Sequence, residues 1–78
     1  MNPTQIIKLI QTELANAKVL VDTEDQVHFH VTVISAEFEG MSAVKRQQKV
    51  YAALGSYITS GELHAVAMKT LTPDEVKS

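Results

Sequence analysis

The fold is decided by the stretch Val27-His28-Phe29-His30-Val31-Thr32-Val33-Ile34, in which apolar and polar residues alternate with a period of two. Successive side chains of a β-strand point to opposite faces of its sheet, so the set beginning with Val27 shares one face and the set beginning with His28 the other. The stretch predicts a strand with one buried face and one polar face. Upstream, Lys18 to Asp22 carries the β-branched run Val19-Leu20-Val21, which predicts a second strand. The two strands are expected to pair as a hairpin through the acidic loop 22–26.

Helical spacing predicts one amphipathic helix before this hairpin and another after it. Thr4 is the expected N-cap of the first helix, whose apolar residues are Ile6, Ile7, Ile10, Leu14 and Ala17. Ser42 is placed to cap the second helix, and Ser60-Gly61 is expected to end it. The buried stripe of the second helix is expected to contain Val44, Tyr51, Leu54 and Ile58, flanked by Val50 and Tyr57.

The rest of the chain predicts a third strand and a short terminal helix. Leu63 to Lys69 is a run of small and apolar residues interrupted by His64. Thr72-Pro73-Asp74-Glu75 has the form of an N-cap, a proline at the first helical position and first-turn acids. The order α-β-β-α-β-α predicts an α+β fold in a single small domain, residues 1–78, with helices packed on one face of the sheet.

Composition narrows the possible functions. The chain of 78 residues has no cysteine, which excludes a disulfide scaffold, a thiolate zinc site and a cysteine nucleophile, and it lacks the thiolates that normally hold an iron–sulfur cluster. A net charge of −2 gives no global attraction to nucleic acid. No motif pairs a serine with a histidine and a carboxylate, so we do not expect an enzyme. We see no secretory signal and no membrane span, which favours a cytoplasmic protein with no membrane partner.

Several motifs closely resemble the BolA-like family, in the same order and spacing along almost the whole chain. They are Val27-His28-Phe29-His30-Val31, Phe38-Glu39-Gly40-Met41-Ser42, Val44-Lys45-Arg46-Gln47-Gln48-Lys49-Val50-Tyr51, Leu63-His64-Ala65-Val66, Lys69-Thr70 and Thr72-Pro73-Asp74-Glu75. The Arg46-Gln47-Gln48 form is similar to the IbaG branch. Two departures are the loop Glu24-Asp25-Gln26-Val27, which lacks the usual glycine, and Val76, where most relatives have tryptophan. The resemblance implies a three-stranded fold related to the class II K-homology domain.

The resemblance also implies a function. Family members pair with a monothiol glutaredoxin and share a two-iron, two-sulfur cluster with it, in iron–sulfur trafficking and stress response. The glutaredoxin cysteine and glutathione supply the thiolates, so the isolated chain is expected to hold no cofactor. The resemblance makes His64 of the Leu-His-Ala motif a metal ligand, and His28 matches the position of a second ligand. Imidazole is a suitable ligand for iron or zinc.

Each assignment has a plain alternative. From the pattern alone, the favoured interpretation of His64 is a partly buried histidine bonded to backbone, and that of His28 and His30 is a solvated strand face. Whether His28 or His30 joins His64 as a ligand is open. Lys45, Arg46 and Lys49 form a compact basic helix face, which is either simply solvated or contacts nucleic-acid phosphate or the glutaredoxin.

The alternative function is therefore a nucleic-acid-binding transcriptional regulator that uses this basic face on DNA. Against K-homology-type RNA binding, Gly40-Met41-Ser42-Ala43 lacks the second glycine of the Gly-x-x-Gly loop. The sequence leaves a homodimer open.

Overall fold

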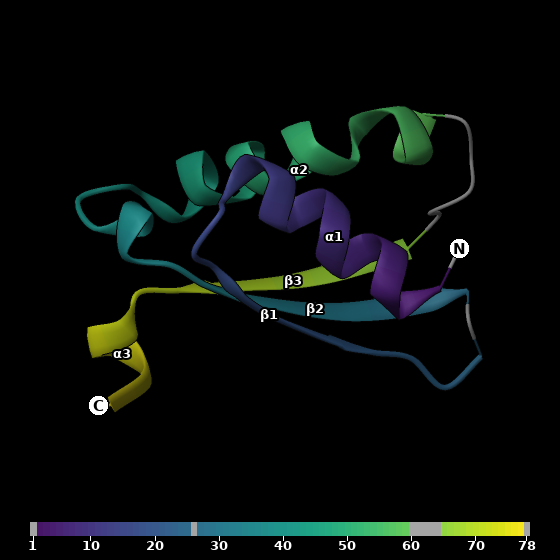
Figure 1. The fold of residues 1–78 in the computed structure, drawn as a ribbon, viewed down its shortest axis with the longest axis horizontal. Coiled ribbons are helices and arrows are strands. Elements are labelled where there is room, and N and C mark those ends of the chain that lie inside the picture. Colours follow the sequence, from purple (N-terminus) through teal and green to yellow (C-terminus); the bar gives the residue numbers. More distant parts are fainter. Residues whose placement is uncertain (1, 26, 60–64, 78) are drawn as a thin grey trace.

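A computed structural model describes residues 2–25, 27–59 and 65–77 of the chain. The elements are α1 (Pro3–Glu13), β1 (Lys18–Asp22), β2 (His28–Ile34), the 3-10 helix η1 (Ala36–Phe38), α2 (Ala43–Thr59), β3 (Ala65–Leu71) and α3 (Pro73–Lys77) (Figure 1). The predicted α+β class and the predicted order of helices and strands are both confirmed.

The three strands form one mixed sheet with β2 in the centre. β1 pairs antiparallel with β2, with Val19 opposite Val33, which confirms the predicted hairpin. β3 pairs parallel with β2, and the register sets His28 opposite Ala65. A parallel neighbour requires a crossover connection, and α2 lies within it. β3 runs to Leu71, two residues beyond the predicted end, while the predicted first residues of this strand, Leu63 and His64, lie outside the described residues.

The alternation in β2 determines which face of the sheet is buried. Phe29, Val31 and Val33 are almost completely buried, whereas His28 and His30 are exposed on the opposite face. Val27 was also expected on the buried face, but it precedes the strand and is 48% exposed. Its alternation with Phe29 does not bury it, because the chain at Val27 still belongs to the loop.

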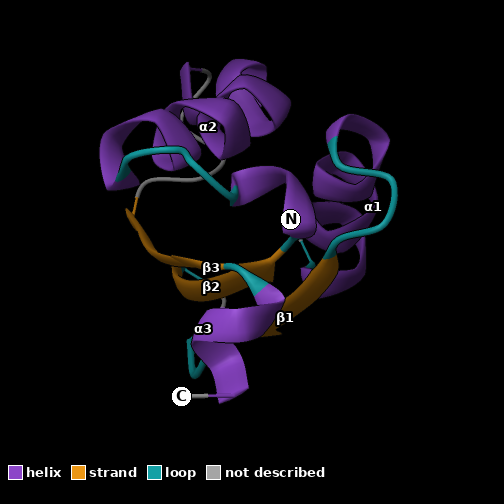
Figure 2. Ribbon diagram, turned by 90° about the vertical axis from the view of Figure 1, so that its left-hand side faces the viewer, coloured by secondary structure: helices purple, strands orange, loops and turns teal. Residues whose placement is uncertain are grey.

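The helices α1 and α2 pack over the face of the sheet that carries Phe29, and α3 lies on the side away from them (Figure 2). The expectation that the helices share one face of the sheet is therefore wrong for α3. The core consists of Ile6, Ile10, Leu14, Ala17, Val19, Phe29, Val31, Val33, Phe38, Val50 and Leu54. Of the five apolar residues predicted for the first helix, Ile6 and Ile10 lie in α1 and belong to the core, and Ile7 packs against it. Leu14 and Ala17 are buried in the same core, but they follow Glu13, where α1 ends, so the predicted helix was too long.

The buried stripe predicted for α2 is partly wrong. Val50 and Leu54 are completely buried, but Val44 is 62% exposed and Tyr51 is 41% exposed. Residues 50 and 51 are one position apart and therefore point about 100° apart around the helix. Apolar residues occupy both directions, so spacing alone could not choose between them. The side chain of Ile58, also assigned to the stripe, lies outside the described residues.

Side chains cap the helices as the sequence indicates, with one shift. Ser42 accepts a hydrogen bond from the backbone N–H of Lys45, which confirms it as the α2 cap. The cap of α1 is Asn2 and not Thr4: Asn2 Oδ1 accepts the N–H of Gln5 at 2.9 Å, and Gln5 Oε1 accepts the N–H of Asn2. Pro3 follows at the first helical position, where no N–H is needed. The predicted end of α2, Ser60-Gly61, lies outside the described residues.

Candidate metal-ligating site

The chain enters β2 through a turn that is organised by the side chain of Asp25. Its Oδ1 accepts the backbone N–H of Val27 at 2.9 Å and that of His28 at 2.8 Å. An aspartate that bonds backbone N–H groups two and three residues ahead is a usual turn-forming arrangement. It fixes the backbone at the first residue of the strand, where His28 begins the polar face.

The second carboxylate oxygen of Asp25 contacts the ring of the same histidine. His28 Nδ1 lies 2.7 Å from Asp25 Oδ2, and the side chains are 67% and 50% exposed respectively. The backbone N–H of His28 is the largest cause that holds the pKa of the Asp25 carboxyl well below its ordinary value, followed by the ring of His28 and the N–H of Val27. Asp25 is therefore ionised at neutral pH, and the exposure of its side chain to solvent also favours the ionised form.

His28 shares a surface hollow of about 270 Å³ with His30 and three acidic residues, namely Asp22, Glu24 and Asp25. Asp22 lies directly opposite His30 in the antiparallel pairing of β1 and β2. The structure thus brings His28 and His30 to one hollow on the polar side of the sheet. Within the described ranges, no group of three or more His, Asp or Glu side chains is placed to hold a metal ion.

His64, the principal ligand expected from the sequence, lies outside the described residues. The residue after it, Ala65, is the first of β3 and is the register partner of His28. The start of β3 therefore lies beside the start of β2.

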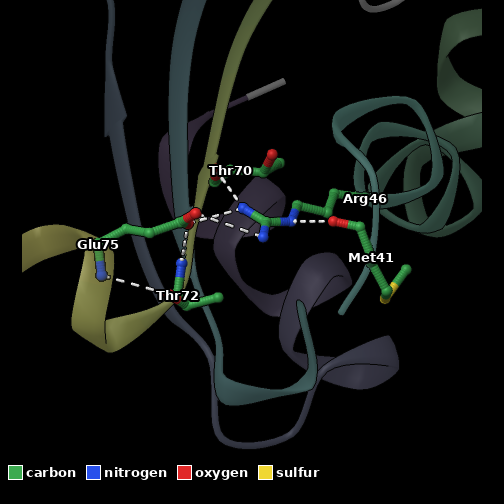
Figure 3. Close-up of polar contacts among 5 residues, drawn as sticks. All are labelled: Met41, Arg46, Thr70, Thr72 and Glu75. Carbon is green, nitrogen blue, oxygen red and sulfur yellow. Dashed lines mark hydrogen bonds and ion pairs between the residues drawn. The ribbon is translucent and has the colours of Figure 1, made fainter. Parts of the chain in front are cut away.

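The three residues of the predicted basic face have different environments. Lys45 is exposed, Lys49 is half-buried, and the Arg46 side chain is only 13% exposed. Arg46 Nε donates to the carbonyl of Met41 at 3.0 Å, and its Nη1 donates to the carbonyl of Thr70 at 3.3 Å and to Glu75 Oε1 at 2.7 Å (Figure 3). Its guanidinium also lies 5.8 Å from the centre of the Phe38 ring. Arg46 thus joins α2 to β3 and α3, a role that the pattern of charges on α2 does not indicate.

Glu75 completes this network from α3. Its Oε1 also accepts the backbone N–H of Thr72 at 2.7 Å, and Thr72 Oγ1 accepts the N–H of Glu75 at 3.2 Å, which confirms Thr72 as the predicted cap. The bond from Arg46 is the largest cause that lowers the pKa of the Glu75 carboxyl below its ordinary value, and the N–H of Thr72 adds to it. The Thr72-Pro73-Asp74-Glu75 motif revealed the cap but not the partner of Glu75 across the fold.

Asp25 is the residue that sequence reasoning missed, because residues 22–26 were interpreted only as a polar loop. The available signal was an aspartate two residues before Val27 and three before His28, at the start of the predicted strand. That spacing is typical of an aspartate-stabilised turn.

Fold and site together define a small α+β domain in which a histidine held by an aspartate starts the central strand of a mixed sheet. The chain belongs to the BolA-like family, whose sequence model matches residues 5–75. This confirms the resemblance drawn from the motifs.

Individual relatives agree with this assignment. The chain is 44% identical over 69 residues to the acid stress protein IbaG of Escherichia coli strain K12, covering 85% of this chain and 82% of the relative. It is 39% identical over 75 residues to a protein of Acinetobacter guillouiae, covering 96% and 89%. A bolA protein homologue from Coxiella burnetii has a similar structure, with a TM-score of 0.85 at 37% identity and coverage of 100% and 99%. BolA1 from Arabidopsis thaliana has a TM-score of 0.79 at 32% identity and covers 92% of each chain.

In the described part of the chain, no helix combines the length and the apolar character needed to cross a membrane.

Proposed function

We propose that this protein is a non-enzymatic partner of a monothiol glutaredoxin and that it helps to ligate a two-iron, two-sulfur cluster shared between them. His64 is the principal ligand from this chain and His28 the second. Membership of the BolA-like family supports the proposal, because the motifs that carry His28 and His64 match that family in order and spacing.

The observation that carries the proposal is the register between β2 and β3. His28 is paired with Ala65, the first residue of β3. His64 is the residue directly before Ala65 in the sequence. Because the strands are parallel, His28 and Ala65, the residue that follows His64 in the sequence, start their strands at the same end of the sheet.

The chemistry of the donors is consistent with a shared cluster. His28 is exposed, and within the described part of the chain its Nε2 has no hydrogen-bond partner, so it is accessible to a metal on a docked protein. The chain has no cysteine, so the cysteine of the glutaredoxin and glutathione supply the thiolates. Replacing thiolate ligands by histidines raises the reduction potential of such clusters.

A role in acid stress follows from the same chemistry. The Escherichia coli relative is named an acid stress protein. An imidazole must be neutral to ligate a metal, so acid weakens histidine ligation. We propose that the shared cluster is accordingly less firmly held by this protein as the pH falls.

The test is to mix the protein with cluster-loaded monothiol glutaredoxin and to record visible absorption and circular dichroism spectra. We expect the native protein to change the spectrum, and His64→Ala to abolish most of that change. His30→Ala is the matched control, because His30 is exposed on the same sheet face and lines the same hollow as His28. Identical spectra for His64→Ala and the native protein would remove His64 from the ligands, and no change with the native protein would remove the partnership.

Regulation through DNA, the alternative function, has less support. Its basic face needs Lys45, Arg46 and Lys49 together, and the guanidinium of Arg46 is bonded to Met41, Thr70 and Glu75. A salt titration of duplex DNA binding tests it directly, because each phosphate contact contributes to the salt dependence. Binding that weakens when Lys45 and Lys49 are neutralised would favour this alternative.

A further inference from the structure

We propose that Asp25 is a positioning residue for His28: it holds the ring in the tautomer with the proton on Nδ1, so that Nε2 is the nitrogen presented to a metal. The part of this inference that concerns ligation rests on the proposed function. The part that concerns the ring is a property of the isolated protein and is tested separately.

The two carboxylate oxygens of Asp25 have different partners. Oδ1 alone accepts the two backbone N–H groups that form the turn, those of Val27 and His28. Oδ2 is not needed for the turn, and it lies 2.7 Å from His28 Nδ1. The ring contact is therefore an addition to the turn and not a by-product of it.

The charge of Asp25 determines the direction of the hydrogen bond between His28 Nδ1 and Asp25 Oδ2. An ionised carboxylate can only accept hydrogen bonds, whereas a neutral imidazole has one nitrogen that donates and one that accepts. The two backbone hydrogen bonds from Val27 and His28 favour the ionised form of Asp25. Nδ1 must then be the donor, and the lone pair of the neutral ring is on Nε2.

The remaining ring nitrogen of His28, Nε2, belongs to an exposed side chain. His28 starts β2 at the end of the molecule that carries the β1–β2 loop (Figure 1). Its side chain is 67% exposed. Metal-binding histidines commonly donate their other ring N–H to a carboxylate, which fixes the tautomer and raises the basicity of the ligating nitrogen. Asp25 and His28 have this arrangement.

The substitution Asp25→Asn is expected to change the tautomer of His28 without breaking the turn. The amide oxygen of asparagine can accept the N–H groups of Val27 and His28, so the turn is kept. The amide nitrogen then occupies the place of Oδ2 and donates, which requires Nδ1 to accept and moves the ring proton to Nε2. Glu24→Gln is the matched control, because Glu24 lines the same hollow and the charge change is equal, yet no described hydrogen bond joins it to His28.

The first measurement uses the isolated protein and NMR of the ring nitrogens at pH 8.5, about two units above the unperturbed pKa of histidine. We expect the proton of His28 on Nδ1 in the native protein and in Glu24→Gln, and on Nε2 in Asp25→Asn. Unchanged amide resonances of Val27 and His28 will show that the turn persists. A native ring protonated on Nε2, or a tautomer that Asp25→Asn does not alter, would overturn the inference.

The second measurement adds cluster-loaded monothiol glutaredoxin to the same variants and follows the visible circular dichroism. We expect Asp25→Asn to lower the apparent affinity, measured from the spectral response, by about 10- to 100-fold. This is the usual effect of losing the hydrogen-bond partner of a ligating histidine. If the tautomer changes and the response does not, His28 is not a ligand. That result contradicts the proposed role of His28 as a ligand, but it still shows that Asp25 fixes the tautomer of the His28 ring.

Discussion

Arg46 Nη1 lies 2.7 Å from Glu75 Oε1, an ion pair between residues 29 positions apart that joins the first turn of α2 to the first turn of α3. It connects α2 to the segment that follows β3. The same guanidinium bonds the carbonyl groups of Met41 and Thr70, so one side chain connects a loop, a strand and two helices.

Arg46→Ala is expected to lower the free energy of unfolding by about 2 kcal/mol, because two partly buried carbonyl groups and the Glu75 carboxylate lose the hydrogen bonds that Arg46 donates. Urea denaturation followed by circular dichroism measures the change. Lys45→Ala is the control, since Lys45 is exposed on the adjacent position of α2 and should change the stability by less than about 0.5 kcal/mol. Equal effects of the two substitutions would contradict a structural role for Arg46.

Glu75→Gln is expected to reduce stability at neutral pH and to have much less effect in acid. The pKa of Glu75 is lowered in the folded protein, so its ionised form stabilises the fold above the ordinary pKa, about 4.5, and this contribution is lost as the pH falls through the folded value. Melting temperatures at pH 7 and pH 3 should therefore differ less in the variant than in the native protein. Glu39→Gln, at an exposed loop position, should leave that difference unchanged.

Leu54→Ala is expected to cost about 2–5 kcal/mol, because it opens a cavity at a completely buried position. Val44→Ala should cost less than about 0.5 kcal/mol, since Val44 is mostly exposed. Chemical denaturation of the two variants therefore tests which side of α2 faces the core. A larger loss for Val44→Ala than for Leu54→Ala would contradict the packing described here.

Asn2→Ala is expected to destabilise the protein by about 1 kcal/mol through loss of the reciprocal cap at α1. Thr4→Ala should have a smaller effect, because Thr4 is exposed within the first turn and does not occupy the cap position. Thermal unfolding compares them. If Thr4→Ala proved the more damaging substitution, the helix would start later than residue 3.

The sequence alone predicted those parts of the fold that depend on local patterns. The alternation around Phe29 identified the central strand and its buried face, and Ser42 and Thr72 were recognised as caps because capping involves residues within one turn. The hairpin of β1 and β2 followed from two short strands separated by a polar loop. These features need no knowledge of distant residues.

The sequence predictions that were wrong concern features that depend on distant residues, or positions where two neighbouring residues could serve equally well. Val44 and Leu54 are both apolar, and only the packed sheet decides that Leu54 is buried. Arg46 was grouped with the lysines because Glu75 is 29 residues away and no spacing rule connects them. Asn2 replaced Thr4 as the cap because both residue types can serve, and the proline between them favours the earlier one.

The parallel pairing of β2 with β3 has a consequence for how such a protein can change during evolution. It sets the starts of both strands at one end of a molecule 32 Å long, and the contacts of Arg46 with Thr70 and Glu75 near the other end (Figure 1). Effects of substitutions at well-separated sites usually add. A lineage can therefore alter the loop around Asp25, where we propose that His28 ligates a metal, while the contacts that secure its C-terminal helix stay as they are.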